Sequence, residues 1–300
     1  MGPVEPTAQI QRRRKRIPAT EVRERMFEAA REIVRLRGVT ISLEELSMDE
    51  VVSSAGVPRS SAYRLWPYKG DFVNDLLLHF AGPKPDWMAF SAFDEETLML
   101  AAEILLKRWG DLSTTEGRLR AADEAIRVAV QRNFDAIAES PDWQVYAALS
   151  ATARGNSNDA SRSELVKALD DADLIFVHQM AAFYELVGRS VGLRPVEGMT
   201  YEQLALAGAA VVEGLAIRKV LLDASGGPEG PMAAHLLATV PAPRGSRPAP
   251  WSLVARAYRG IFFELLEPVA EWQADEHVRV AIERVAKHGP NGSNKMKSQT

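Results

Sequence analysis

The sequence predicts an all-α fold, and three observations support that prediction. Apolar residues recur at spacings of three and four over long stretches, which is the pattern of helices with one buried face. No stretch of five or more residues alternates convincingly between apolar and polar side chains, and turn signals are too sparse for a β fold. The 300 residues are 46% hydrophobic and 25% charged, so the composition suits a globular protein of two domains or one large one.

The first helix is expected to begin at Thr20, whose hydroxyl suits an N-cap, and to end before Gly38. Its predicted buried stripe is Val22, Met26, Phe27, Ala30, Ile33 and Val34. The preceding residues 1–18 have no apolar period and carry five basic residues against one acid. We expect them to form a disordered basic arm that contacts DNA or simply aids solubility.

Two short helices and a longer one are predicted next. Ser47 followed by Glu50 is a capping-box pattern, so a helix should start there and break at Ala55-Gly56-Val57. Pro58 suits the start of a second helix over 59–66, and Pro67 ends it. A further helix should run from residues 69–71 to about residue 80.

The rest of the chain reads as longer helices separated by polar loops. Residues 223–250 hold four glycines and six prolines, which predicts a connection with one helical turn near 232–238. Pro268 should interrupt or kink the last helical region. The expected helices cover residues 95–109, 116–139, 142–154, 163–191, 200–222, 251–266 and 269–287.

Composition excludes several classes of protein. The absence of cysteine removes disulfides, thiolate nucleophiles and Cys-ligated metal sites. The net charge of −4 excludes a strongly basic nucleic-acid coat, although residues 1–18 alone carry +4. We expect a soluble cytoplasmic protein, because neither a signal peptide nor a membrane-spanning segment is visible.

Catalytic motifs are not apparent in the sequence. The five histidines form no His-Glu-x-x-His pair, and there is no Gly-x-Ser-x-Gly, Walker or dinucleotide-binding pattern. We therefore expect neither an enzyme nor a bound metal or cofactor.

Residues 47–72 carry the functional signal. Two short helices joined by a tight glycine turn form a helix-turn-helix, and the second helix is too short and polar to be stable alone. Arg59, Ser60, Ser61 and Arg64 suit contacts to phosphates and base edges in a major groove. The pattern alone is equally compatible with a turn that joins two core helices.

The segment Gly56-Val57-Pro58-Arg59-Ser60-Ser61-Ala62-Tyr63-Arg64-Leu65-Trp66-Pro67-Tyr68-Lys69 resembles the signature of TetR/AcrR transcriptional regulators. Residues 26–34 with Gly38, and 47–52 with Ala55, resemble the first two helices of that family. The resemblance covers residues 20–80. It departs from the family pattern at Pro58, Leu65, Trp66 and Tyr68, and in a longer connector over 39–46.

The resemblance implies a DNA-binding domain over 19–82 and an effector-binding and dimerisation domain over 83–287. The composition predicts a disordered basic arm over 1–18 before them and a disordered tail over 288–300 after them. The resemblance also implies that Arg59, Ser60, Ser61 and Arg64 face DNA, that Tyr63 and Lys69 contact phosphates, and that Ser47 lies at an anion-binding helix start. Alternatively, Tyr63 belongs to the domain core and Lys69 lies at a solvated helix end.

The second domain is expected to bind a small, largely apolar effector. Ten aromatic residues lie between 84 and 190, and an apolar pocket needs aromatic walls with a few polar groups. Aromatic residues at helical spacing are also ordinary core, and His178 suits a satisfied core histidine. The candidate ligand contacts are Trp109, Phe134, Trp143, Tyr146, His178, Met180, Phe183 and Tyr184.

The helices over 201–222 and 251–266 are too apolar for one buried face. We expect them either to form a four-helix interface between two subunits, as the family does, or to be internal to one subunit. A twofold dimer would read a palindromic operator in double-stranded DNA. The resemblance therefore implies a homodimeric repressor released by its effector. The alternatives are an activator on the same scaffold and a DNA-binding protein without an effector.

Overall fold

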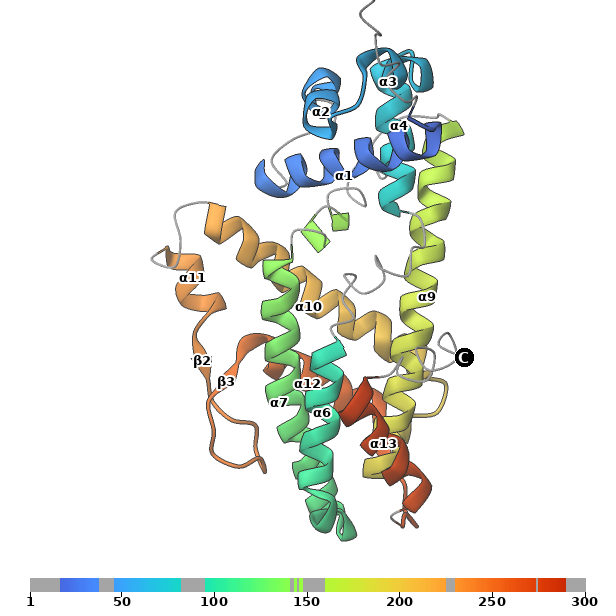
Figure 1. Ribbon diagram of the computed structural model, residues 1–300. Helices are drawn as coiled ribbons and strands as arrows, with labels where there is room; N and C mark the ends of the chain where they lie inside the picture. The colour runs from blue at the N-terminus through green and yellow to red at the C-terminus, as the bar shows by residue number, and fades with distance from the viewer. Residues whose placement is uncertain are drawn as a thin grey trace, which may run out of the picture. The chain divides into compact units, whose positions relative to one another are not determined.

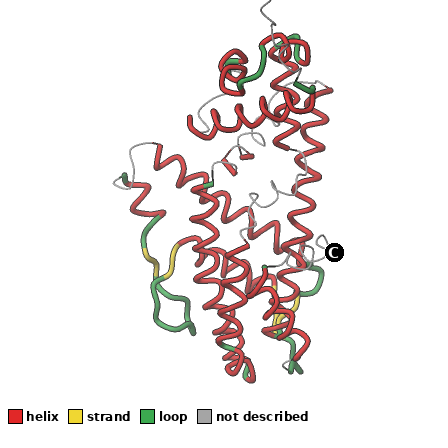
Figure 2. The backbone as a smooth tube through the Cα atoms, viewed as in Figure 1, coloured by secondary structure: helices red, strands yellow, loops and turns green. Residues whose placement is uncertain are grey.

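The computed structural model describes residues 17–37, 46–81, 95–140, 143–144, 146–147, 160–224, 230–273 and 275–289. Helix predominates among these residues, which confirms the all-α prediction at that level (Figure 2). The chain divides into two compact units between His79 and Phe80. Most of the predicted arm, the connector after Gly38, the loop at 155–159 and nearly all of the tail lie outside the described residues.

The first unit contains the helices α1 (Ala19–Arg37), α2 (Met48–Ala55), α3 (Arg59–Leu65) and most of α4 (Lys69–Ala81). Helix α1 packs on α2 and α3. Its centre is an aromatic cluster in which Phe27 lies 4.3 Å from the ring of His79 and 5.8 Å from that of Trp66. Trp66 in turn meets Phe72 edge-on at 5.0 Å. Burial of these rings contributes to the apolar driving force that holds this small unit together, beside aliphatic residues such as Met26 and Leu76.

The start of α1 differs from the sequence prediction. The helix begins at Ala19, and the backbone carbonyl of Pro18 accepts the N–H of Val22 at 3.0 Å. Thr20 therefore lies inside the first turn, and the predicted N-cap at Thr20 is wrong by two residues. Proline is favourable at or just before the start of a helix, so Pro18 allows the helix to begin before Thr20.

The second unit is a bundle in which α7 (Thr115–Glu139) packs on several other helices. The helix α6 (Glu95–Lys107) runs beside it, and α10 (Tyr201–Ala224) and α12 (Leu253–Leu265) also pack against it (Figure 1). The described ranges of this unit also contain η1 (Trp109–Ser113), α9 (Ala160–Val191), α11 (Pro231–Leu236) and α13 (Glu276–His288). None of the helices in the described ranges combines the length and hydropathy needed to cross a bilayer.

Two short antiparallel ladders join loops of the second unit, and the sequence did not predict them. Strand β1 (Leu193–Pro195) pairs with β4 (Leu266–Pro268), and β2 (Thr239–Val240) pairs with β3 (Trp251–Ser252). Strands of two or three residues are too short to show a period of two.

The last predicted helix also starts later than expected. It begins at Glu276, because β4 ends at Pro268 and Asp275 caps the helix by accepting the N–H of His277 at 2.8 Å.

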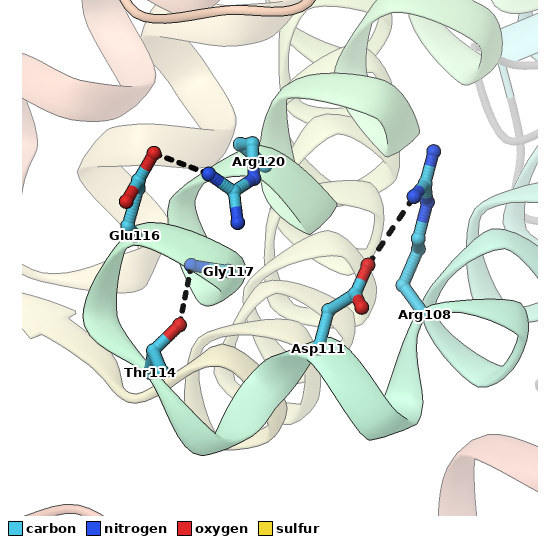
Figure 3. A network of polar contacts seen from close by, with 6 residues as sticks. All are labelled: Arg108, Asp111, Thr114, Glu116, Gly117 and Arg120. Atoms are coloured by element: carbon cyan, nitrogen blue, oxygen red, sulfur yellow. Dashed lines mark hydrogen bonds and ion pairs between the residues drawn. The ribbon is translucent and has the colours of Figure 1, made fainter.

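The corner between η1 and α7 requires a glycine. The hydroxyl of Thr114 caps α7 by accepting the N–H of Gly117 at 3.0 Å (Figure 3). A Cβ atom on Gly117 would lie 1.8 Å from the carbonyl oxygen of Asp111. Backbone atoms cannot give way as a flexible side chain does, so any larger residue must push η1 away from α7.

Replacing Gly117 by alanine should therefore destabilise the protein by about 2 kcal/mol, which is typical of overpacking. Gly110→Ala is the matched control, because nothing lies within 4 Å of a Cβ at that position. Chemical denaturation of both variants measures the difference. Equal free energies of unfolding for the two variants would contradict the assigned corner.

Candidate functional site

The turn between α2 and α3 is built from local signals in the sequence. Ser47 caps α2 through its hydroxyl, which accepts the N–H of Glu50 at 3.5 Å. Gly56 ends α2 with φ at 61° and ψ at 27°, a left-handed conformation that glycine adopts at little cost. Val57 is buried in the turn, and α3 starts directly after Pro58. The capping box, the glycine turn and the proline start were all predicted.

Helix α3 presents a polar face to solvent. Its side chains Arg59, Ser60 and Arg64 are exposed, and Ser61 is half-buried. Ala62 is fully buried and holds the helix on the rest of the unit. Helix α3 carries two arginines and no acidic residue. Among the other predicted contacts, Ser47 and Lys69 are exposed at the starts of α2 and α4.

Asp49 joins α2 to α3 and was not singled out from the sequence. One oxygen of its carboxylate lies 2.5 Å from Nη2 of Arg59, and the other accepts the hydroxyl of Tyr63 at 2.7 Å. The Arg59 guanidinium lies 5.7 Å from the centre of the Tyr63 ring. The Tyr63 hydroxyl and the Asp49 carboxylate raise the pKa of Arg59 above its ordinary value. The aspartate thus restrains both side chains on the exposed face, with Tyr63 at 37% exposure.

Trp66 anchors the end of α3 from inside. The residue is 1% exposed, and its indole N–H donates to Asp75 of α4 at 2.8 Å. Arg23 of α1 also contacts Asp75, at 3.1 Å, and its guanidinium lies 5.6 Å from the Trp66 ring. These contacts fix α3 against α1 and α4, so its outer face is held on a rigid support.

A mostly apolar cavity of about 80 Å³ lies within the second unit. Helices α6, α7, α9 and α12 line it, and alanines of α7 leave the space open. Its polar groups are few. The carboxamide oxygen of Asn133 is buried and has no hydrogen-bond partner among the described residues. Tyr184 and Tyr258 interact through their hydroxyls, and burial raises the pKa of Tyr184 to about 12. Both phenols are therefore neutral at physiological pH.

The structure brings three of the eight predicted ligand contacts to this cavity, namely Met180, Phe183 and Tyr184. Trp143 and Phe134 are buried in the core, and Trp109 and Tyr146 are partly buried against it. His178 is exposed, so its expected place in the core is wrong, because it falls on the outer face of α9. Tyr258 and Phe262 of α12 also line the cavity and were not predicted as contacts. The alanines of α7 at the cavity, Ala122, Ala125 and Ala129, were not predicted either, although their spacing of three and four places small side chains on one helix face.

The predicted dimer helices differ in what they expose. Helix α10 leaves Leu206, Ile217 and Leu221 at 56%, 44% and 63% exposure. Helix α12 buries Val254, Ala255, Tyr258 and Phe262, and its other large apolar side chains are half-buried. Helix α10 thus keeps a more exposed apolar face in the single chain than α12 does.

Glu213 on α10 is a half-buried titratable group near Asp173 of α9. Burial raises its pKa from 4.5 to about 7, and the nearby Asp173 of α9 adds to that shift. The folded protein therefore binds this proton more tightly than the unfolded chain does. The resulting contribution to stability is complete below about pH 4.5 and is lost as the pH rises to about 7.

Glu213→Gln should remove this pH dependence. The free energy of unfolding of the unmodified chain is expected to fall by up to about 3 kcal/mol relative to the variant between pH 4.5 and 8. Denaturation curves across that range measure the difference. Glu264→Gln, at an exposed position of α12, serves as the control and should follow the unmodified chain.

No family model matches the sequence, and neither does any of the curated proteins compared with it. In the described part of the chain, no group of three or more histidine, aspartate or glutamate side chains has the spacing to hold a metal ion.

Proposed function

We propose that this chain is a DNA-binding transcriptional regulator of the TetR type, acting as a homodimer that a small apolar effector releases from its operator. The observation that carries this proposal is the exposed polar face of α3, on which Asp49 restrains Arg59 and Tyr63. A short surface helix held from behind by a buried tryptophan, with cations and hydroxyls outward, has the form of a helix that reads a groove.

The dimensions and charge of α3 are compatible with a major groove. An α-helix with its side chains is about 10–12 Å in diameter, and the major groove is about 12 Å wide. Helix α3 has no acidic residue that could pair with Arg64, which lies one turn beyond Ser60 and Ser61. In the proposed complex Arg64 contacts a base edge or phosphate, and the Asp49 contact sets the direction of Arg59. Restraint before binding lowers the entropy that DNA binding costs.

The cavity supports the effector part of the proposal. A pocket with apolar walls and a few neutral polar groups favours an uncharged, largely apolar molecule. The neutral tyrosines and the Asn133 oxygen can form hydrogen bonds with a ligand, and none of these groups carries a charge that a ligand would have to balance. Binding would release DNA only if the effector prefers the form of the protein that binds DNA less well.

The exposed apolar face of α10 supports the dimer part of the proposal. Leu206, Ile217 and Leu221 are large side chains that a second copy would cover by a twofold contact. Two equivalent reading helices would then meet two half-sites, and the operator would be a palindrome.

Selection of bound sequences from random double-stranded DNA, with the purified full-length protein, tests the proposal. Recovery of a palindromic motif is the expected result. A folded dimer that enriches no motif would overturn the assignment of α3 as a sequence reader.

Arg64→Ala should weaken binding to the selected sequence by about tenfold, since an arginine contact to a base contributes about 1–3 kcal/mol. Arg284→Ala removes an equal charge from an exposed position of α13 and should leave the affinity unchanged. Fluorescence anisotropy measures the affinity, and analytical ultracentrifugation checks that both variants remain dimers. Equal affinities of the two variants would count against Arg64 as a groove contact.

A further inference from the structure

A second, polar pocket of the second unit is lined by four arginines. Arg108 follows α6, Arg120 and Arg127 belong to α7, and Arg247 lies in the loop between β2 and β3. The pocket has room for about one water-sized group, with a volume of about 10 Å³. It shares no lining residue with the apolar cavity. Trp251 of β3 completes its inner wall.

The two carboxylates in this pocket are already matched by other groups. Asp123 lies 2.5 Å from Nε of Arg259 on α12, and it also accepts the hydroxyl of Ser246. Glu124 accepts two hydrogen bonds from Arg127, at 2.9 and 3.2 Å. Arg127 lowers the pKa of Glu124, and the charges of Arg108 and Arg247 act in the same direction. The positive charge of Arg108, Arg120 and Arg247 is therefore not cancelled inside the pocket.

The partners of these arginines lie outside the pocket. Arg108 contacts Asp111 at 3.2 Å, and Arg120 contacts Glu116 (Figure 3). Glu116 is 78% exposed and Asp111 is 44% exposed, so water screens both carboxylates. In the described ranges, no carboxylate lies within ion-pair distance of Arg247, which is exposed at the mouth of the pocket.

Two enclosed N–H groups of the lining residues lack an acceptor among the described residues. One is the indole N–H of Trp251, a residue that is 2% exposed. The other is the Nε–H of Arg120, which is buried even though the tip of its guanidinium reaches Glu116. Buried donors are nearly always satisfied in folded proteins. A group with an acceptor oxygen and a negative charge would satisfy both donors and balance the arginines at once.

We propose that this pocket binds an oxyanion, the phosphate or carboxylate group of a small acidic molecule. One oxygen enters the pocket and accepts from Trp251 and Arg120, and the rest of the molecule extends toward solvent past Arg247. Bound there, the anion joins the loop between β2 and β3 to the first turns of α7. This site is distinct from the apolar effector cavity, and its occupation does not depend on the proposed DNA binding.

Titration calorimetry of the full-length protein with inorganic phosphate and, separately, with benzoate tests the site at constant ionic strength in chloride. Saturable binding of at least one of the two anions is expected. Binding of phosphate alone assigns the site to phosphate esters, and binding of benzoate alone assigns it to carboxylates. The indole N–H resonance of Trp251, identified by its absence from the Trp251→Phe variant, should move during the same titration.

Arg247→Gln should weaken the binding by about tenfold, because the change removes a positive charge beside the bound anion. Arg244→Gln is the matched control, because Arg244 is an exposed arginine of the same loop that does not line the pocket. Both positions are exposed, so neither change threatens the fold. Absence of saturable binding for both anions would overturn the proposal, as would equal affinities of the two variants or an unmoved Trp251 resonance.

Discussion

The second unit depends on the close approach of Gly117 to the carbonyl of Asp111. That contact, together with the Thr114 cap, fixes where α7 begins and which way its faces point. Helix α7 packs on α6, α10 and α12, so an error in its rotation would reach most of the core. Because a helix turns by about 100° per residue, the side chains of neighbouring positions on α7 face different parts of the unit. Ala122, Ala125 and Ala129 border the apolar cavity, whereas Arg120, Asp123 and Glu124 border the polar pocket.

The ion pair between Asp123 and Arg259 ties these two environments together. Asp123 is 6% exposed, and an unpaired carboxylate there would carry a large desolvation penalty. Arg259 of α12 offsets part of that penalty, and the Ser246 hydroxyl donates a hydrogen bond from the loop before β3 to the same carboxylate. On the same helix, Tyr258 and Phe262 line the apolar cavity. Helix α7 thus lines both sites, and α12 lines the apolar cavity while its Arg259 pairs with Asp123 of the polar pocket.

In the first unit, a different constraint organises the exposed face. Trp66 and Asp75 hold α3 from the inside, and Asp49 restrains two of its outer side chains. Asp49 lowers the positive charge of this face. In the proposed DNA complex it would also order Arg59 and Tyr63 before contact, at the expense of long-range attraction.

Spacing and polarity along the chain were enough to predict the helical class, the Ser47 cap, the Gly56 turn and the exposed character of Arg59, Ser60 and Arg64. These features arise from interactions between residues fewer than five apart, or from the polarity of a single helix face. Contacts between distant residues became visible only in the folded chain. Asp49 meets residues 10 and 14 positions away, and Asp123 meets Arg259 across 136 positions. Tyr258 and Phe262 share a cavity with Met180, Phe183 and Tyr184, and His178 turned outward instead. No local sequence pattern predicts such long-range contacts, because they depend on how each helix is rotated against the helices that it packs on.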